Sequence, residues 1–181
     1  DVRSESDIIE LMKLATSDGP LSIACNAAGI GEGAPIYEQE LEQWNKVVDI
    51  CLTGVFLAVK HEAKAMLKLG GSIVNIASIH ARLTFPNYFP YGAAKSAVLG
   101  LTRNLGIDEG HNNIRCNAVS PGYIMTPLSE AWYAEEAGRY ERALSIQPMG
   151  RVGQAVEIAK IVTFLLSDDA SFVNGSDWAA D

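Results

Sequence analysis

Ser72-Ile73-Val74-Asn75-Ile76-Ala77 is a short, mostly apolar run that follows Gly70-Gly71 and leads into Ser78. Its length and the flanking glycines are typical of a strand that is buried on both faces of a sheet. Two further runs, residues 21–25 and residues 114–119, have the same character, and turn residues follow each of them. Helical patterns separate the three runs, and this alternation predicts an α/β fold with a parallel sheet covered on both faces.

Apolar residues recur at helical spacing in four segments, for which we expect helices. These segments are residues 6–17, 38–69, 88–109 and 155–166. Ser6 or Asp7 is expected to cap the first helix. Residues 173–181 alternate like a further strand, and residues 123–151 form a polar segment rich in aromatic residues. No internal repeat or linker is visible, which predicts a single domain over residues 1–181.

The composition excludes several classes of protein. The chain has 181 residues, of which 48% are hydrophobic and 20% are charged, and this balance argues against disorder. A formal net charge of −8, without a run of Lys or Arg, disfavours nucleic acid or an anionic membrane as the main partner. Cys25, Cys51 and Cys116 are widely spaced in apolar runs, which favours reduced core cysteines. No secretory signal is visible, and we expect a cytoplasmic protein.

The side chains suited to chemistry follow the predicted strands. In a parallel α/β sheet, ligands bind beyond the carboxyl ends of the strands. Tyr91 and Lys95 are one helical turn apart, so a lysine ammonium is expected to lower the pKa of the tyrosine. Ser78 ends a strand thirteen positions before Tyr91 and offers a hydroxyl to a substrate oxygen. Taken singly, the Tyr–Lys pair also fits a solvated helix face, and Ser78 also fits a turn that caps the next segment.

In order and spacing, these residues resemble the short-chain dehydrogenase/reductase family. The resemblance rests on six motifs and covers essentially the whole chain. They are Asn26-Ala27-Ala28-Gly29, Asn75-Ile76-Ala77-Ser78, Tyr91-Gly92-Ala93-Ala94-Lys95, Ile114-Arg115-Cys116-Asn117, Ser120-Pro121-Gly122 and Pro148-Met149-Gly150-Arg151. The resemblance implies a Rossmann-like, doubly wound sheet. It also implies an NAD- or NADP-dependent oxidoreductase that interconverts a secondary alcohol and a carbonyl.

The resemblance also implies roles for particular residues. Tyr91 is expected to be the general acid and base, Ser78 to hold the substrate oxygen, and Lys95 to lower the pKa of Tyr91 and to bind the nicotinamide ribose. His80 is expected to contact a polar substrate. The remaining cofactor contacts are expected at Asp1, Asn26, Pro121, Gly122, Ile124 and Thr126, with Asp1 next to adenine. No metal site is expected.

The sequence departs from the family pattern in three ways. The glycine-rich turn that binds the pyrophosphate is absent, which predicts an N-terminally truncated fragment lacking about two strand–helix units. Such a fragment is expected to bind the cofactor weakly or not at all. Cys51 stands where the family has a catalytic Asn that helps to hold a water in a proton relay, and a thiol is a weak hydrogen-bonding group. Ala27 replaces the second Asn of the usual pair, a change that we expect to be tolerated.

Residues 123–150 are expected to form a lid over the substrate. Met125, Trp132, Tyr133 and Tyr140 are expected to line an apolar or sugar-stacking wall, although packing of an amphipathic lid helix explains them equally well. Together with His80 they favour a sugar or another hydroxylated small molecule, with an oxoacyl thioester or a steroid as alternatives. We expect self-association into a homodimer or homotetramer. Two other functions remain open, a non-catalytic scaffold relative and an epimerase or dehydratase.

Overall fold

A computed structural model describes all residues 1–181. Its main sheet has four parallel strands in the order β1-β2-β3-β6. Their bounds are Ile23–Asn26 for β1, Gly71–Ile76 for β2, Ile114–Pro121 for β3 and Asp177–Ala180 for β6. Asn26 lies opposite Asn75, Asn75 opposite Ala118, and Ala118 opposite Asp177. This register brings the carboxyl ends of all four strands to one edge of the sheet.

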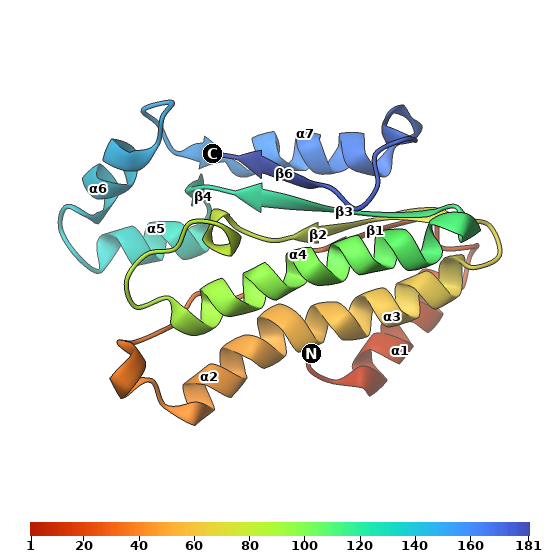
Figure 1. The fold of residues 1–181 in the computed structure, drawn as a ribbon, viewed down its shortest axis with the longest axis horizontal. Coiled ribbons are helices and arrows are strands. Elements are labelled where there is room, and N and C mark those ends of the chain that lie inside the picture. The colour runs from red at the N-terminus through yellow and green to blue at the C-terminus, as the bar shows by residue number, and fades with distance from the viewer.

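Helices cover both faces of this sheet (Figure 1). One face carries α3 (Gly54–Met66) and α4 (Phe89–Glu109), with α2 (Leu41–Val48) packed on α4 and α1 (Glu5–Ala15) on α3. The other face carries α7 (Ala155–Leu166). The structure confirms the α/β class and the doubly wound, Rossmann-like arrangement. No helix in the chain is long and apolar enough to span a bilayer.

Two short helices project beyond the carboxyl ends of the strands, at the same end of the molecule as the start of α4 (Figure 1). They are α5 (Pro127–Ala134) and α6 (Arg139–Ile146). A second sheet pairs β4 (Ile124–Met125) with β5 (Gly153–Gln154) and ties this segment to the start of α7. Short helical turns complete the chain, at Ile36–Glu38 (η1), Ile79–Ala81 (η3), Gly110–Asn112 (η4) and Asp168–Ala170 (η5).

Two apolar layers stabilise the domain. Met66, Ile73 and Ile114 are fully buried between the sheet and α3 and α4. Val74 and Leu165 are fully buried in the second layer, between the sheet and α7. Each such side chain contributes about 1.5–3 kcal/mol through burial, so neighbouring strand residues hold helices on opposite faces.

The longest predicted helix is interrupted. In place of one helix over residues 38–69, α2 runs into a π-helical turn, η2 (Asp49–Thr53), and then into α3. Single π turns inside α-helices are frequent at functional sites, and this one contains the buried Cys51. The first helix also differs from expectation, because Ser4 rather than Ser6 or Asp7 caps it and accepts a hydrogen bond from the backbone N–H of Asp7.

The expectation of a buried first strand and of three core cysteines is partly wrong. Ile23 is 54% exposed and Cys25 is exposed, whereas Cys51 and Cys116 are buried. The physical reason is the position of β1 at the edge of the sheet, where strand neighbours lie on one side only. All three thiols are free.

Candidate active site

The structure brings Ser78, Tyr91 and Lys95 together at the carboxyl edge of the sheet. Ser78 directly follows Ala77 at the end of β2, and Tyr91 and Lys95 lie in the first turns of α4. The Ser78 hydroxyl lies close enough to the Tyr91 phenol to lower its pKa. The Lys95 ammonium nitrogen lies 5.7 Å from the centroid of the Tyr91 ring. A hydroxyl, a phenol and an amine therefore converge on one spot, as the spacing of the three residues predicts.

A contact with strand β2 holds the Lys95 side chain in place. Only 3% of the residue is exposed, and its Nζ donates a hydrogen bond of 2.7 Å to the backbone carbonyl of Ile76 in β2. Burial lowers the pKa of Lys95, because an ammonium loses hydration there. An ammonium carries three donors, so two N–H groups remain for other partners.

The expectation that Lys95 lowers the pKa of Tyr91 is wrong for this site. Burial raises the pKa of Tyr91 from 10.0 to about 12, because the phenolate loses its hydration. The nearby Ser78 hydroxyl lowers the pKa but does not offset the burial. Tyr91 is therefore protonated at neutral pH, and its role as a proton donor remains a prediction.

Cys51 fastens the turn that follows β1. Its thiol donates to the carbonyl of Ile30 at 3.2 Å and accepts from the N–H of Ile30 at 3.3 Å. The π turn brings the sulfur close to Gly29 and Lys95, because a Cβ on Gly29 would lie 3.7 Å from the Cys51 sulfur and 3.5 Å from the Lys95 nitrogen. Cys51 thus makes a paired donor and acceptor contact with one backbone unit, which a side-chain amide can also make.

His80 stands beside Tyr91 within a group of aromatic rings. The His80 ring centroid lies 5.3 Å from that of Tyr91, 4.8 Å from that of Tyr88 and 5.1 Å from that of Phe85. Its Nδ1 lies 3.3 Å from the Thr84 hydroxyl. Burial lowers the pKa of His80, so the imidazole is neutral at pH 7.

The ring contacts continue into the segment that was expected to form a lid. Centroid distances are 6.1 Å for Phe85–Tyr123, 6.2 Å for Tyr123–Trp132, 5.2 Å for Trp132–Tyr133 and 5.3 Å for Tyr133–Tyr140. Tyr123 and Trp132 are stacked at an interplanar angle of 20°. A continuous series of rings therefore links α5 and α6 to Tyr91. We define the aromatic wall as His80, Phe85, Tyr88, Tyr123 and Trp132.

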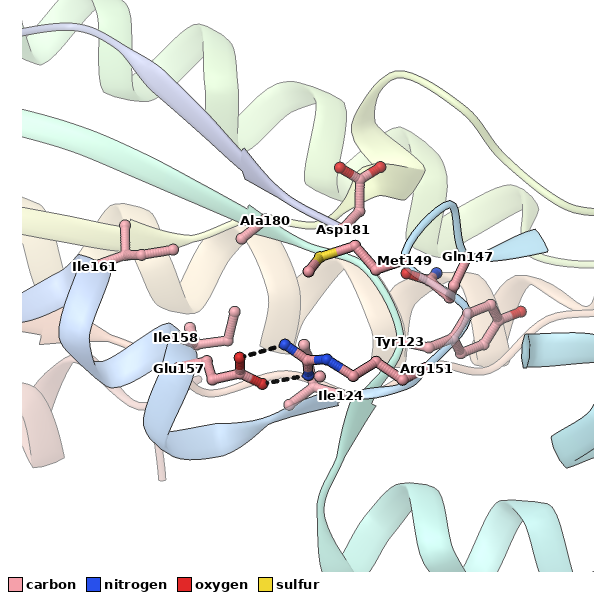
Figure 2. A pocket seen from close by; sticks show the side chains of 11 residues that line it. Tyr123, Ile124, Gln147, Met149, Arg151, Glu157, Ile158, Ile161, Ala180 and Asp181 are labelled. Carbon is pink, nitrogen blue, oxygen red and sulfur yellow. Dashed lines mark hydrogen bonds and ion pairs between the residues drawn. The ribbon is translucent and has the colours of Figure 1, made fainter. Parts of the chain in front are cut away.

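A pocket lies next to the residues expected to bind the nicotinamide (Figure 2). It has a volume of about 180 Å³, and Ile124, Ile158 and Ile161 supply apolar lining. Arg151 and Glu157 form a two-point ion pair at its side, with N–O distances of 2.7 and 2.6 Å.

Pro121 ends β3, and Gly122 follows it and leads to Tyr123, which lines this pocket. A Cβ on Gly122 would lie 2.8 Å from the Cβ of Asp181, so only glycine fits this close approach. Thr126 caps α5, where its Oγ1 accepts a hydrogen bond from the N–H of Ser129 at 3.2 Å. These residues hold the turn in place, and their contacts to a cofactor remain predictions.

Asn26 and Asp1 occupy positions that the sequence did not reveal. The Asn26 amide donates to Glu62 and to Asn75, each at 3.0 Å, so the side chain points into the domain. The Asp1 carboxylate pairs with Arg3, just before α1. Contacts of Asn26 and Asp1 with a cofactor remain predictions.

Sequence reasoning missed Glu62, which is only 5% exposed. Burial raises the pKa of this carboxyl, and its hydrogen bond from Asn26 opposes that rise. Helical spacing offered a signal, because Glu62 lies four positions before Met66 and three after Val59, both of which belong to the core.

The parallel sheet, its covered faces and the Ser–Tyr–Lys group at its carboxyl edge define the class of protein. The chain belongs to the short-chain dehydrogenase/reductase family. A family model described as enoyl-(acyl carrier protein) reductase matches residues 1–181.

Two curated relatives and two solved structures illustrate the similarity. The cyclohexanol dehydrogenase of Acinetobacter sp. (strain SE19) is 44% identical over 165 residues, which are 90% of this chain and 63% of that protein. The 2,5-dichloro-2,5-cyclohexadiene-1,4-diol dehydrogenase of Sphingobium indicum is 40% identical, with 100% of this chain and 74% of that protein covered.

A short-chain type dehydrogenase/reductase from Mycobacterium ulcerans superimposes with a TM-score of 0.95 and 33% identity, over 100% of this chain and 66% of that one. ElxO with NADP bound gives a TM-score of 0.94 and 31% identity, over 100% and 74%. The chain thus spans between about three fifths and three quarters of these relatives.

Proposed function

We propose that the chain carries the active site of an NAD- or NADP-dependent oxidoreductase that interconverts a secondary alcohol and a ketone on a six-membered alicyclic ring. The convergence of Ser78, Tyr91 and Lys95 beside the aromatic wall carries this proposal. Its support is the protonated phenol of Tyr91, which lies near the Ser78 hydroxyl and a buried ammonium.

Each of the three side chains has one role in this reaction. Tyr91 donates its phenolic proton to the carbonyl oxygen during reduction and takes it back during oxidation. Ser78 holds the same oxygen by a hydrogen bond, which fixes it against the phenol. Lys95 anchors the base of the site through Ile76 and offers its remaining N–H groups to the cofactor ribose. The cofactor, when bound, supplies or accepts the hydride.

The residues present fit the nicotinamide end of such a cofactor. Lys95 has donors to spare, and the close approach at Gly122 and the pocket at Ile124 lie next to each other on the same edge of the sheet. A glycine-rich turn for the pyrophosphate is not among the 181 residues. We therefore assign Pro121, Gly122, Ile124 and Thr126 to the nicotinamide end only.

The substrate class follows from the lining of the site. Four aromatic rings and one neutral imidazole form the aromatic wall, which favours a flat or ring-shaped apolar body. A polyol needs several hydrogen-bonding partners, and the imidazole offers few. The names of the two curated relatives contain a cyclohexane or cyclohexadiene ring bearing hydroxyl groups. We therefore favour an alicyclic alcohol over the sugar that the sequence alone suggested, with His80 contacting the ring or a second hydroxyl.

The domain is proposed to act as a homodimer or homotetramer. Phe56 on α3 is 48% exposed and Ile107 on α4 is 77% exposed, which leaves apolar surface for a second copy.

The proposal is tested by following reduced-nicotinamide absorbance with purified protein, with NAD and NADP in separate series. The substrates are cyclohexanol, cyclohexane-1,4-diol and sorbitol. We expect turnover of the two ring alcohols and little of sorbitol. Turnover of sorbitol alone would refute the substrate class. Absence of turnover with every alcohol, in protein that a binding titration shows to hold NAD or NADP, would refute the activity. The Tyr91→Phe variant is the matched control for the chemistry.

A further inference from the structure

The turn that carries Ser78 is a closed unit of backbone hydrogen bonds. Ser78 begins η3, where its hydroxyl accepts from the N–H of His80 at 3.2 Å and its carbonyl accepts from the N–H of Ala81 at 2.9 Å. Arg82 ends the turn, and its N–H donates to the carbonyl of Ile79 at 2.9 Å. A displacement of Arg82 is therefore transmitted to Ser78 and His80.

Asp177 anchors the far end of this turn. Arg82 projects from the turn, and its Nη2 lies 2.8 Å from Oδ2 of Asp177. The Asp177 side chain is only 7% exposed, whereas that of Arg82 is 57% exposed. No directional hydrogen bond reaches this Oδ2, so the contact is an ion pair across the surface of the sheet.

The same carboxylate also holds the other side of the site. The Ser120 hydroxyl donates to Oδ1 of Asp177 at 2.6 Å. Asp177 pairs with Ala118 in the sheet, and Ser120 lies two residues further along the same strand, on the same face. Ser120 directly precedes Pro121 and Gly122, the turn assigned to the nicotinamide end. One carboxylate, from β6, thus contacts both the substrate-side turn and the cofactor-side turn.

We propose that Asp177 is a positioning residue that fixes the Ser78 turn relative to the Pro121–Gly122 turn through Arg82 and Ser120. The proposal rests on the proposed function, because it assigns those turns to substrate and cofactor. Each carboxylate oxygen has its own partner, so the two contacts can be separated by substitution. Rigid placement matters because small displacements of a substrate-binding group lower turnover strongly.

The substitutions have different expected effects. Arg82→Ala leaves a nearly buried carboxylate without its cation, which is unfavourable and loosens the turn. Asp177→Asn keeps an acceptor for Ser120 but loses the ion pair. The double variant removes the unpaired charge, so its defect is expected to equal that of Asp177→Asn instead of the sum of the two. Arg82→Lys keeps the charge and is expected to restore function. Lys13→Ala, which breaks an exposed pair with Glu10 on α1, is the control.

Two measurements test the positioning role of Asp177. In the full chain with cyclohexanol, we expect Arg82→Ala to lower kcat/KM roughly tenfold, while Lys13→Ala leaves it unchanged. Backbone amide hydrogen exchange, which needs no turnover, is expected to speed up at residues 79–84 and at residues 122–123 in Arg82→Ala but not in Arg82→Lys.

The outcomes separate the two proposals. Unchanged amide hydrogen exchange in Arg82→Ala would overturn the positioning role of Asp177, even if no alcohol is turned over. Faster exchange with unchanged kcat and KM would show a merely structural contact and would also overturn it. Faster exchange together with a lower kcat/KM, rescued by Arg82→Lys, supports it. Should Arg82→Ala not fold, Asp177→Asn gives the same comparisons.

Discussion

Replacing Tyr91 by Phe removes one oxygen atom and leaves the ring in place. That oxygen lies near the Ser78 hydroxyl, and the proposed reaction uses it as the proton donor. A positioned general acid or base contributes about 10²- to 10⁴-fold to rate, so kcat/KM of Tyr91→Phe is expected to fall by about that factor. Because the ring remains packed, thermal stability near neutral pH should change little.

The raised pKa adds a second effect that does not depend on turnover. The pKa of Tyr91 is about 12 in the folded chain, whereas the ordinary value of a tyrosine is 10.0. The folded state therefore binds the phenolic proton more tightly than the unfolded state does. The stabilisation is fully present below about pH 10 and is lost as the pH rises through about 12. This rise in pKa corresponds to about 3 kcal/mol, a large part of the stability of a small domain. The Tyr91→Phe variant should not lose this stability at high pH.

The assays are steady-state kinetics with cyclohexanol, urea unfolding at several alkaline pH values, and titration of phenolate absorbance. Burial also raises the pKa of Tyr88, Tyr123 and Tyr133, so the parent should show several late-titrating phenols and the variant one fewer. The reasoning fails if Tyr91→Phe turns over as fast as the parent. It also fails if the variant loses the same stability between about pH 10 and about pH 12, since burial of the phenol would then not be the cause.

Three further predictions concern one residue of the site and two residues that stabilise the fold. Cys51→Asn should retain turnover because an amide replaces both contacts to Ile30, whereas Cys51→Val should lower kcat; matched steady-state kinetics compare them. Gly33→Ala should lower the melting temperature by an amount equivalent to about 1–3 kcal/mol, because its Cβ would lie 2.0 Å from the carbonyl oxygen of Asn87. Met66→Ala should lower the free energy of unfolding in urea by about 2–5 kcal/mol, since Met66 is fully buried; a smaller value would show that the core collapses into the cavity.

The elements that the sequence predicted well are those that local pattern decides. The helix expected over residues 155–166 has those bounds in the structure, because apolar spacing and the change at Ser167 both mark it. Strand β2 was also found within one residue at each end, since glycines precede it and a hydroxyl turn follows. The sequence did not identify Ser4 as the cap, because Ser6 and Asp7, within the first turn of α1, are also residue types that cap helices.

Other features depend on contacts between distant parts of the chain. The exposure of Cys25 follows from the edge position of β1. The residue pattern of a single strand does not reveal its place in the order of the sheet. The ion pair of Arg82 with Asp177 joins a loop to the last strand, and neither residue lies in a recognisable motif. The convergence of Ser78, Tyr91 and Lys95 was predictable because parallel strands end at one edge and helical spacing places Tyr91 above Lys95.

The pKa of Tyr91 shows most clearly why the rest could not be predicted. Spacing placed an ammonium near the phenol, and charge alone suggested a lowered pKa. Burial acts on both groups in the direction of the neutral form, so it raises the pKa of Tyr91 and lowers that of Lys95. The sign of the shift therefore depends on how much water the packing of His80 and Tyr88 leaves at the site, which only the folded structure determines. A buried, protonated phenol is poised to give its proton to a carbonyl oxygen, whereas taking one from an alcohol first requires the phenolate that burial disfavours.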